Sequence, residues 1–153
     1  MLDIHQFREL VIAPALEAID ARSLAAEELL LGTALQESGL MYLKQIGGGP
    51  ALGLFQMESI THDDIWLNYL AYRPILSEKM TALEPSQTAR ALVTNLLYAA
   101  AMCRVHYLRV TSPLPEAGDY EAHAAYWKKY YNTPAGAGTA EEYLTNWKAH
   151  VFT

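Results

Sequence analysis

One carboxylate in the first third of the chain lies where a helix would present apolar side chains. A helix is predicted from Ser23, a good N-cap, to about Leu43. At about 100° per residue, Glu37 falls within an apolar stripe about 80° wide, which is formed by Ala26, Leu30, Ala34 and Met41. Burial raises the pKa of a carboxyl group, as a general acid at neutral pH requires. The alternative is a structural glutamate paired with a Lys or Arg.

A glycine-rich segment follows this helix directly. The residues Gly47-Gly48-Gly49-Pro50 end the helix, and glycines allow a backbone to approach a ligand closely. The next residues are Gly53-Leu54-Phe55-Gln56. We expect Leu54 and Phe55 to belong to the core.

Two motifs in this order resemble those of the soluble lytic transglycosylases and goose-type lysozymes of the lysozyme-like superfamily. Gln36-Glu37-Ser38-Gly39 matches the Glu-Ser motif of that family. Gly53-Leu54-Phe55-Gln56 resembles its Gly-Leu-Met-Gln motif, with Phe55 in place of Met.

A third motif, Ala-Tyr-Asn followed by small residues, has its counterpart at Tyr131-Asn132. Tyr130 replaces the Ala and is the alternative to Tyr131 if the register is shifted by one. Thr133-Pro134 is inserted before the small residues. The resemblance spans about residues 23–136, and similar small domains occur in bacteriophage proteins. It implies a lysozyme-like helical domain.

The resemblance also implies that Glu37 is the catalytic acid. It would protonate the glycosidic oxygen between N-acetylmuramic acid and N-acetylglucosamine in peptidoglycan. Ser38 would hydrogen-bond Glu37, a water or an acetamido group beside the cleft, or it would cap the helix C-terminus.

Four further residues would bind substrate or support the acid. Gly53 would let the chain pass close to the sugar, and Gln56 would hydrogen-bond substrate or orient the site. Tyr131 would hydrogen-bond Glu37, and Asn132 would bind an acetamido group or cap its loop.

A second carboxylate would decide the reaction. Retaining hydrolysis needs one about 5 Å from the acid and inverting hydrolysis one about 6.5–9.5 Å away, whereas a lytic transglycosylase needs none, because the acetamido and 6-hydroxyl groups of the sugar complete the reaction. Glu58, two residues after Gln56, stands where goose-type lysozymes carry an acidic residue, and it favours hydrolysis. Asp63 and Asp64 are weaker candidates, because Thr61 and Asp64 form the pattern of a capping box.

Other kinds of active site have little support in the sequence. His62 beside Asp63 could suggest a metal, but a lone His in a helix-capping segment is more often structural, and no HExxH pattern is present. The single cysteine, Cys103, allows neither an intrachain disulfide nor a cysteine-based zinc site. No Gly-x-Ser-x-Gly elbow or phosphate-binding loop occurs. We expect no metal and no cofactor.

The expected fold is mainly α, with at most a small β element near residues 45–58. Beyond the helix at 23–43, helices are predicted from Thr61 to Tyr72, from Gln87 to Val110, from Tyr120 to Tyr130 and from Thr139 to His150. Near the N-terminus, Pro14 is expected to start or kink a helix. A length of 153 residues suits one domain, here residues 1–153.

Composition and charge limit the partners. The chain is 52% hydrophobic and 18% charged, with a net charge of −6, so disorder is excluded as its main state. Scattered Lys and Arg residues argue against nucleic-acid binding. No apolar stretch is long enough to span a membrane, and the N-terminus lacks signal-peptide features.

The expected partner is therefore the peptidoglycan glycan strand. A charge of −6 gives no attraction to an anionic wall. We therefore expect either delivery by a partner, as for a phage endolysin released through a holin or a virion protein, or a place as one domain of an assembly. Three hypotheses remain open: a muramidase, a lytic transglycosylase, and a non-catalytic wall-binding or virion structural module.

Overall fold

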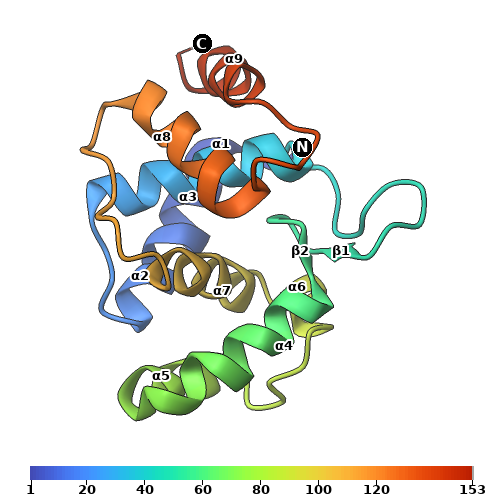
Figure 1. Ribbon diagram of the computed structural model, residues 1–153, viewed down its shortest axis with the longest axis vertical. Helices are drawn as coiled ribbons and strands as arrows, with labels where there is room; N and C mark the ends of the chain where they lie inside the picture. Colours follow the sequence, from blue (N-terminus) through green and yellow to red (C-terminus); the bar gives the residue numbers. More distant parts are fainter. Residues whose placement is uncertain (153) are drawn as a thin grey trace.

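The computed structural model describes residues 1–152 and is mainly helical, as predicted. In Figure 1, α7 crosses the middle of the molecule, with α3, α8 and α9 above it and α4 and α5 below it. The helices are α1 (Ile4–Phe7), α2 (Ala13–Ala18), α3 (Leu24–Ser38), α4 (Ser59–Asn68), α5 (Pro74–Leu83), α6 (Ala91–Thr94), α7 (Leu96–Leu108), α8 (Tyr120–Trp127) and α9 (Ala140–Val151). Three shorter turns join them: the π-helical η1 (Arg8–Ile12) and η3 (Lys128–Asn132), and the 3-10 turn η2 (Leu70–Tyr72).

The small β element lies where it was expected. Strands β1 (Ala51–Leu52) and β2 (Met57–Glu58) pair antiparallel, with Ala51 opposite Glu58. Lys44 adds an isolated bridge to Leu52. The loop before the hairpin extends away from the body of the molecule (Figure 1).

Helix α7 is the centre of the core, because nearly every face of it is buried. Its alanines and aromatic residues are fully enclosed, as are Met102 and Cys103. It packs against α2, α3, α4, α5 and η3. Elements from both halves of the chain are thereby held on one hydrophobic core.

The helix that carries Glu37 ends earlier than predicted. Gly39 adopts a left-handed conformation (φ 59°) and its N–H bonds the Leu35 carbonyl, which terminates α3 after Ser38. Met41 therefore lies outside the helix and is 60% exposed. The expected end near Leu43 and the place of Met41 in the apolar stripe were wrong.

The long helix predicted over residues 87–110 is interrupted at Asn95. This residue is extended (φ −127°, ψ 99°), and its side chain caps α7 by accepting from the Tyr98 N–H. Its amide also donates to the Leu83 carbonyl. These tertiary bonds replace helical continuity between α6 and α7.

Helix starts were predicted with mixed success. The capping box of α9, formed by Thr139 and Glu142, is confirmed. The one predicted for Thr61 and Asp64 is wrong, because α4 begins at Ser59 and includes both residues. Helix α5 was not predicted.

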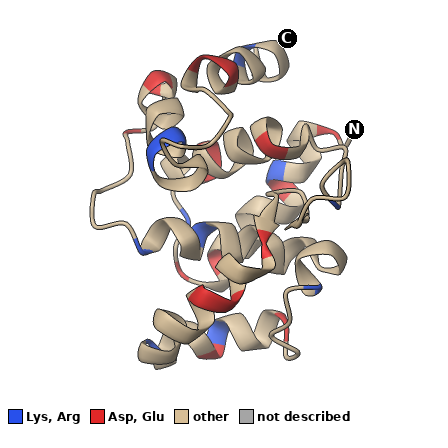
Figure 2. Cartoon of the chain, turned by 45° about the vertical axis from the view of Figure 1, so that its right-hand side comes forward, with Lys and Arg blue, Asp and Glu red and all other residues tan. Residues whose placement is uncertain are grey.

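Acidic and basic side chains are dispersed over the helices (Figure 2). Within residues 1–152, no helix combines the length and the apolar character that crossing a bilayer requires.

Candidate active site

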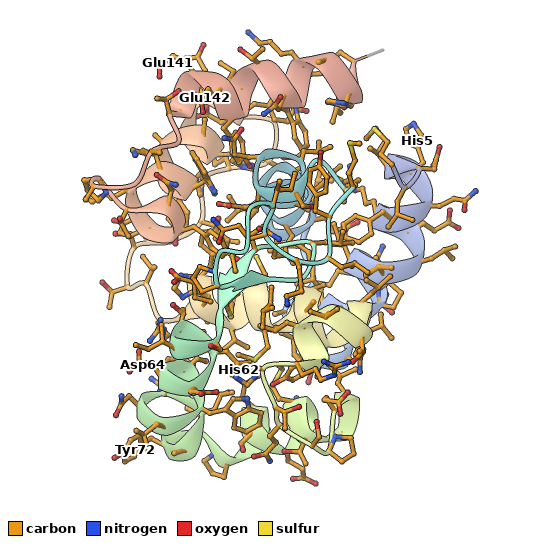
Figure 3. All side chains as sticks on the ribbon, turned by 90° about the vertical axis from the view of Figure 1, so that its right-hand side faces the viewer. His5, His62, Asp64, Tyr72, Glu141 and Glu142 are labelled. Carbon is orange, nitrogen blue, oxygen red and sulfur yellow. The ribbon has the colours of Figure 1, made fainter. Side chains whose placement is uncertain are left out.

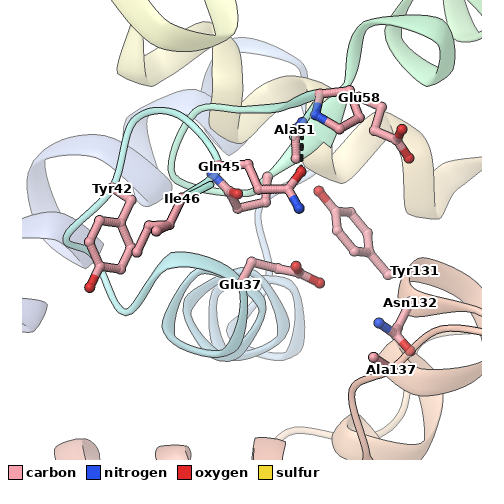
Figure 4. Close-up of a pocket in the computed structure, with 11 residues that line it drawn as sticks. Glu37, Tyr42, Gln45, Ile46, Ala51, Glu58, Tyr131, Asn132 and Ala137 are labelled. Atoms are coloured by element: carbon pink, nitrogen blue, oxygen red, sulfur yellow. Dashed lines mark hydrogen bonds between the residues drawn. The ribbon is translucent and has the colours of Figure 1, made fainter. Parts of the chain in front are cut away.

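A cavity of about 610 Å³ lies between the end of α3, the β-hairpin and the segment after α8. Figure 4 shows Glu37 at its floor and Tyr131 and Asn132 on one wall. Its lining residues are Glu37, Tyr42, Gln45, Ile46, Pro50, Ala51, Gln56, Glu58, Tyr131, Asn132 and Ala137. Five of the seven residues predicted for the site therefore line one cavity, although they come from three parts of the chain.

Glu37 lies in the last turn of α3 and is half-buried. Burial raises the pKa of its carboxyl group from 4.5 to about 7, because desolvation disfavours the charged form. The Trp127 indole opposes part of this effect: its Nε1–H donates to Glu37 Oε1 over 2.9 Å. The outcome is a carboxyl group that exchanges its proton near neutral pH.

The sequence did not reveal this role of Trp127. The tryptophan stands 90 residues from Glu37 and is 1% exposed. Its place in a helix rich in aromatic residues is also what a core residue would show. Only the packing of α8 against α3 brings its N–H to the carboxyl group.

Ser38 does not line the cavity, which corrects its predicted place beside the cleft. Its side chain is buried, and its hydroxyl donates to the Leu54 carbonyl oxygen at 2.6 Å. The Ser38 hydroxyl oxygen also lies 3.2 Å from the Ala34 carbonyl oxygen, and it accepts from the Leu40 N–H. Ser38 thus caps the end of α3, as the alternative interpretation held, and ties it to the turn at residues 53–56.

Gly53 has a different reason to be glycine from the one predicted. It has a positive φ (76°), and a Cβ atom there would stand 2.2 Å from the Leu92 carbonyl oxygen. The close approach is to α6 rather than to a sugar, and Gly53 does not line the cavity. Gln56 does line it, with its side-chain amide donating to the Gly53 carbonyl.

Tyr131 faces the cavity, but its hydroxyl donates to the Phe55 carbonyl oxygen at 2.6 Å rather than to Glu37. This corrects the predicted bond to the acid. Burial raises the pKa of Tyr131 well above its usual range, so the hydroxyl remains a donor. Edge contact with the His106 ring, at 5.0 Å between centroids, fixes the ring further. Tyr131 therefore joins η3 to the hairpin turn.

Asn132 lines the same wall as Tyr131. Its side-chain oxygen accepts from Lys128 Nζ at 2.7 Å, and the same ammonium group donates to the Gly136 carbonyl. This arrangement holds the loop after η3 beside the cavity. It directs the oxygen of Asn132 to Lys128, so its amide nitrogen is the group that could bind a ligand.

Glu58 is the second carboxylate of the cavity. It is exposed and extends from β2, on the other side of the Tyr131 ring from Glu37 (Figure 4). Asp63 and Asp64 do not line the cavity. Asp64 pairs with Arg109 at 2.7 Å, and Asp63 accepts from His62.

His62 is a structural residue buried between α4 and α7. Its Nε2 lies 2.6 Å from the Tyr98 hydroxyl, which also accepts from Trp66 Nε1–H. Figure 3 shows His62 and Asp64 on α4. Among residues 1–152, no three His, Cys, Asp or Glu side chains are grouped so that they could hold a metal ion.

The loop before the hairpin contributes cavity residues that the sequence did not indicate. Tyr42 and Ile46 expose apolar surface at 39% and 66%, and Gln45 accepts from the Ala51 N–H at 3.1 Å. Because Leu43 was expected to end a helix, these residues were not considered as a wall of a cleft. The sequence feature that could have indicated this wall of the cavity is an apolar run beside three glycines.

Comparison of the chain with protein-family models, with curated proteins and with solved structures finds no match in any of the three.

Proposed function

We propose that this protein is a peptidoglycan-cleaving glycosidase, a muramidase, in which Glu37 is the general acid. The observation that carries the proposal is a half-buried carboxyl group with a pKa of about 7 in a cavity of about 610 Å³. A general acid works best when its pKa is near the working pH, because it is then both protonated and able to release the proton.

The cavity has the chemistry that suits an amphipathic sugar chain. Tyr42, Ile46 and Tyr131 offer apolar and aromatic surface for sugar faces. Gln45, Gln56 and Asn132 place amide groups around it, which match acetamido and hydroxyl groups. Peptidoglycan is proposed as the substrate because three motifs of the chain resemble those of lysozyme-like enzymes.

In this mechanism Glu37 donates its proton to the oxygen of the bond between N-acetylmuramic acid and N-acetylglucosamine. Glu58 is the candidate base, since it is the other carboxylate lining the cavity within residues 1–152. It would take a proton from a water that attacks the sugar from the opposite face. The products would carry reducing muramic ends.

A lytic transglycosylase is the second candidate, and the exposure of Glu58 favours it. Within residues 1–152 no hydrogen bond fixes the Glu58 side chain, whereas Glu37 is held by Trp127. A transglycosylase needs one carboxyl group that acts first as acid and then as base. Its products end in 1,6-anhydromuramic acid.

The test is digestion of purified peptidoglycan by the wild type, by Glu37→Gln and by Glu58→Gln, with products identified by mass spectrometry. Glutamine keeps the hydrogen-bond acceptor for Trp127, so Glu37→Gln removes the titrating proton with little change of shape. We expect reducing muramic ends from the wild type and their absence with either variant.

Each other result points to a different function. Anhydro ends that survive Glu58→Gln identify a transglycosylase. Identical products from the wild type and Glu37→Gln overturn the role of Glu37. The absence of any soluble product from the wild type overturns the glycosidase and leaves a wall-binding or virion structural module.

A further inference from the structure

The Glu37 carboxyl group is held by a single side-chain hydrogen bond within residues 1–152. Trp127 Nε1–H donates to its Oε1 at 2.9 Å. A hydrogen bond to an ionised carboxylate is stronger than one between two neutral groups. The indole is 1% exposed, so water does not compete for its N–H.

The indole itself is fixed by close packing on two sides. Its ring lies on Tyr143 of α9, with centroids 5.4 Å apart and planes at 32°. The backbone of Gly138 is so close to the edge of the indole that a Cβ atom there would stand 2.7 Å from Trp127 Cη2. Tyr143 in turn is pressed against Gly32, where a Cβ would meet its hydroxyl at 1.9 Å. The direction of the N–H is therefore set by α8, α9 and the loop between them.

We propose that Trp127 is a positioning residue that fixes the orientation of the Glu37 carboxyl group and assigns different roles to its two oxygens. The catalytic meaning of this role rests on the proposed function, but the interaction itself does not. Because Oε1 accepts from the indole, Oε2 is the oxygen that carries the exchangeable proton. A carboxyl group held in this way presents its proton in one direction rather than two.

The bond from Trp127 also limits how far burial raises the pKa of Glu37. A donor stabilises the ionised carboxylate more than the neutral acid, whereas desolvation does the opposite. Removal of the N–H should therefore raise the pKa of Glu37 from about 7 to about 8.

Few neighbouring groups can imitate this titration. Burial raises the pKa of Tyr131, Tyr143 and Cys103 above their usual ranges, so these three stay uncharged between pH 5 and 9. His106, whose ring contacts Tyr131, has a pKa that burial lowers to about 4, below this range. Other titratable side chains of the surroundings are Tyr42 and Glu58, which line the cavity, and Lys128, which bonds Asn132. The Glu58→Gln variant removes the Glu58 carboxyl group, so a titration that remains in this variant does not come from Glu58.

The test uses the indole N–H resonances of the three tryptophans in the intact protein, recorded by ¹⁵N–¹H NMR from pH 5 to 9. Trp66 donates to Tyr98, whereas the buried Nε1 of Trp147 has no partner within residues 1–152. We expect the Trp127 resonance alone to shift, with a midpoint near the pKa of Glu37. The shift should persist in Glu58→Gln and vanish in Glu37→Gln.

The second measurement follows the Glu37 carboxyl carbon by ¹³C NMR in Trp127→Phe and in Trp147→Phe. Both variants remove a buried indole, but only the first removes a donor to Glu37. We expect the midpoint to rise by about one pH unit in Trp127→Phe and to stay unchanged in Trp147→Phe.

Two results would overturn the proposal: a Trp127 resonance that does not respond to Glu37, or the same midpoint in the wild type and Trp127→Phe. If Trp127→Phe does not fold, the indole titration of the wild type decides alone. Neither measurement requires peptidoglycan cleavage, so an inactive wild type would remove the proposed function and leave the role of Trp127 tested separately.

Discussion

At the scale of single residues, the chemistry of the cavity follows from where α3 ends. Glu37 is in its final turn, so the backbone anchors the side chain firmly while the carboxyl group reaches the cavity. One position earlier, Gln36 bonds Asn146 and Glu142 of α9 instead. A shift of one residue along this helix would replace the acid with an amide.

The first prediction concerns the pH dependence of cleavage. Glu37 must be protonated to donate, and its pKa is about 7. We therefore expect the rate to fall as pH rises above 7, approaching about tenfold per pH unit at high pH. Initial rates on purified peptidoglycan from pH 5 to 9 measure this, and a rate that stays level up to pH 9 would contradict it.

The second prediction concerns stability. The raised pKa means that the folded protein binds more protons than the unfolded chain between about pH 4.5 and 7. The contribution of Glu37 to the free energy of unfolding should therefore decrease as pH rises through this window, by at most about 3 kcal/mol. His106, whose pKa burial lowers to about 4, acts in the opposite direction in the wild type and in Glu37→Gln alike. In Glu37→Gln this decrease is absent, so the variant should be the more stable protein at pH 8.

Urea unfolding of both proteins at pH 4 and pH 8 checks this expectation. Glu58→Gln is the matched control, because it replaces an exposed carboxyl group of the same cavity by the same amide. Parallel losses of stability in the wild type and in Glu37→Gln would show that burial does not act on Glu37.

At the scale of elements, the turn at residues 53–56 is held from three directions. Ser38 binds the Leu54 carbonyl from α3, and Tyr131 binds the Phe55 carbonyl from η3. From the third side, α6 presses the Leu92 carbonyl against Gly53. The turn that carries Gln56 is thereby placed by its neighbours and not by its own two-residue strands.

The third prediction compares two glycines with similar backbone conformations. Gly53 and Gly47 have φ values of 76° and 83°, but only Gly53 is crowded, since no atom lies within 4 Å of a Cβ at Gly47. We expect Gly47→Ala to cost about 1 kcal/mol from backbone strain alone. Gly53→Ala should cost more than about 3 kcal/mol, because strain is joined by a clash with backbone.

Denaturant unfolding of the two variants measures the difference. Equal losses at the two positions would mean that the contact with Leu92 gives way easily, and that α6 does not fix the hairpin turn.

At the scale of the whole molecule, α7 holds the lower helices and the cavity in one body. Below the cavity, Tyr98 of α7 accepts from Trp66 and donates to His62, both on α4. The other ring nitrogen of His62, Nδ1, lies 2.9 Å from Asp63 Oδ1. Above α7, Thr33 of α3 bonds the Tyr107 hydroxyl at 2.8 Å.

The fourth prediction tests the connection that Tyr98 makes between α7 and α4. Tyr98→Phe leaves the half-buried Trp66 Nε1–H and the buried His62 Nε2 without their partner, and we expect a loss of about 3 kcal/mol. Tyr72→Phe is the control, because Tyr72 is 75% exposed and should change stability by less than about 0.5 kcal/mol. Thermal unfolding of both variants gives the comparison, and a similar melting temperature for the two would argue against a shared anchor.

Local sequence was enough to predict the helical class, the position of the hairpin and the capping box of α9. Helical spacing also singled out Glu37 as a carboxylate in an apolar stripe, and the structure places this residue in the lining of the cavity. Local sequence was wrong about the end of α3 and about the helix through Asn95, where a left-handed glycine and bonds to Leu83 override helix propensity.

Only the tertiary structure decided which residues surround the acid. Trp127 and Glu37 meet through the packing of separate helices, and so do Ser38 and Leu54, or Tyr131 and Phe55. Each of these bonds is made where neighbouring elements exclude water, which is a property of the assembled core. Residue types and spacing determine which side chains can do chemistry, whereas burial and partners, which set the pKa of Glu37, arise only when the helices pack.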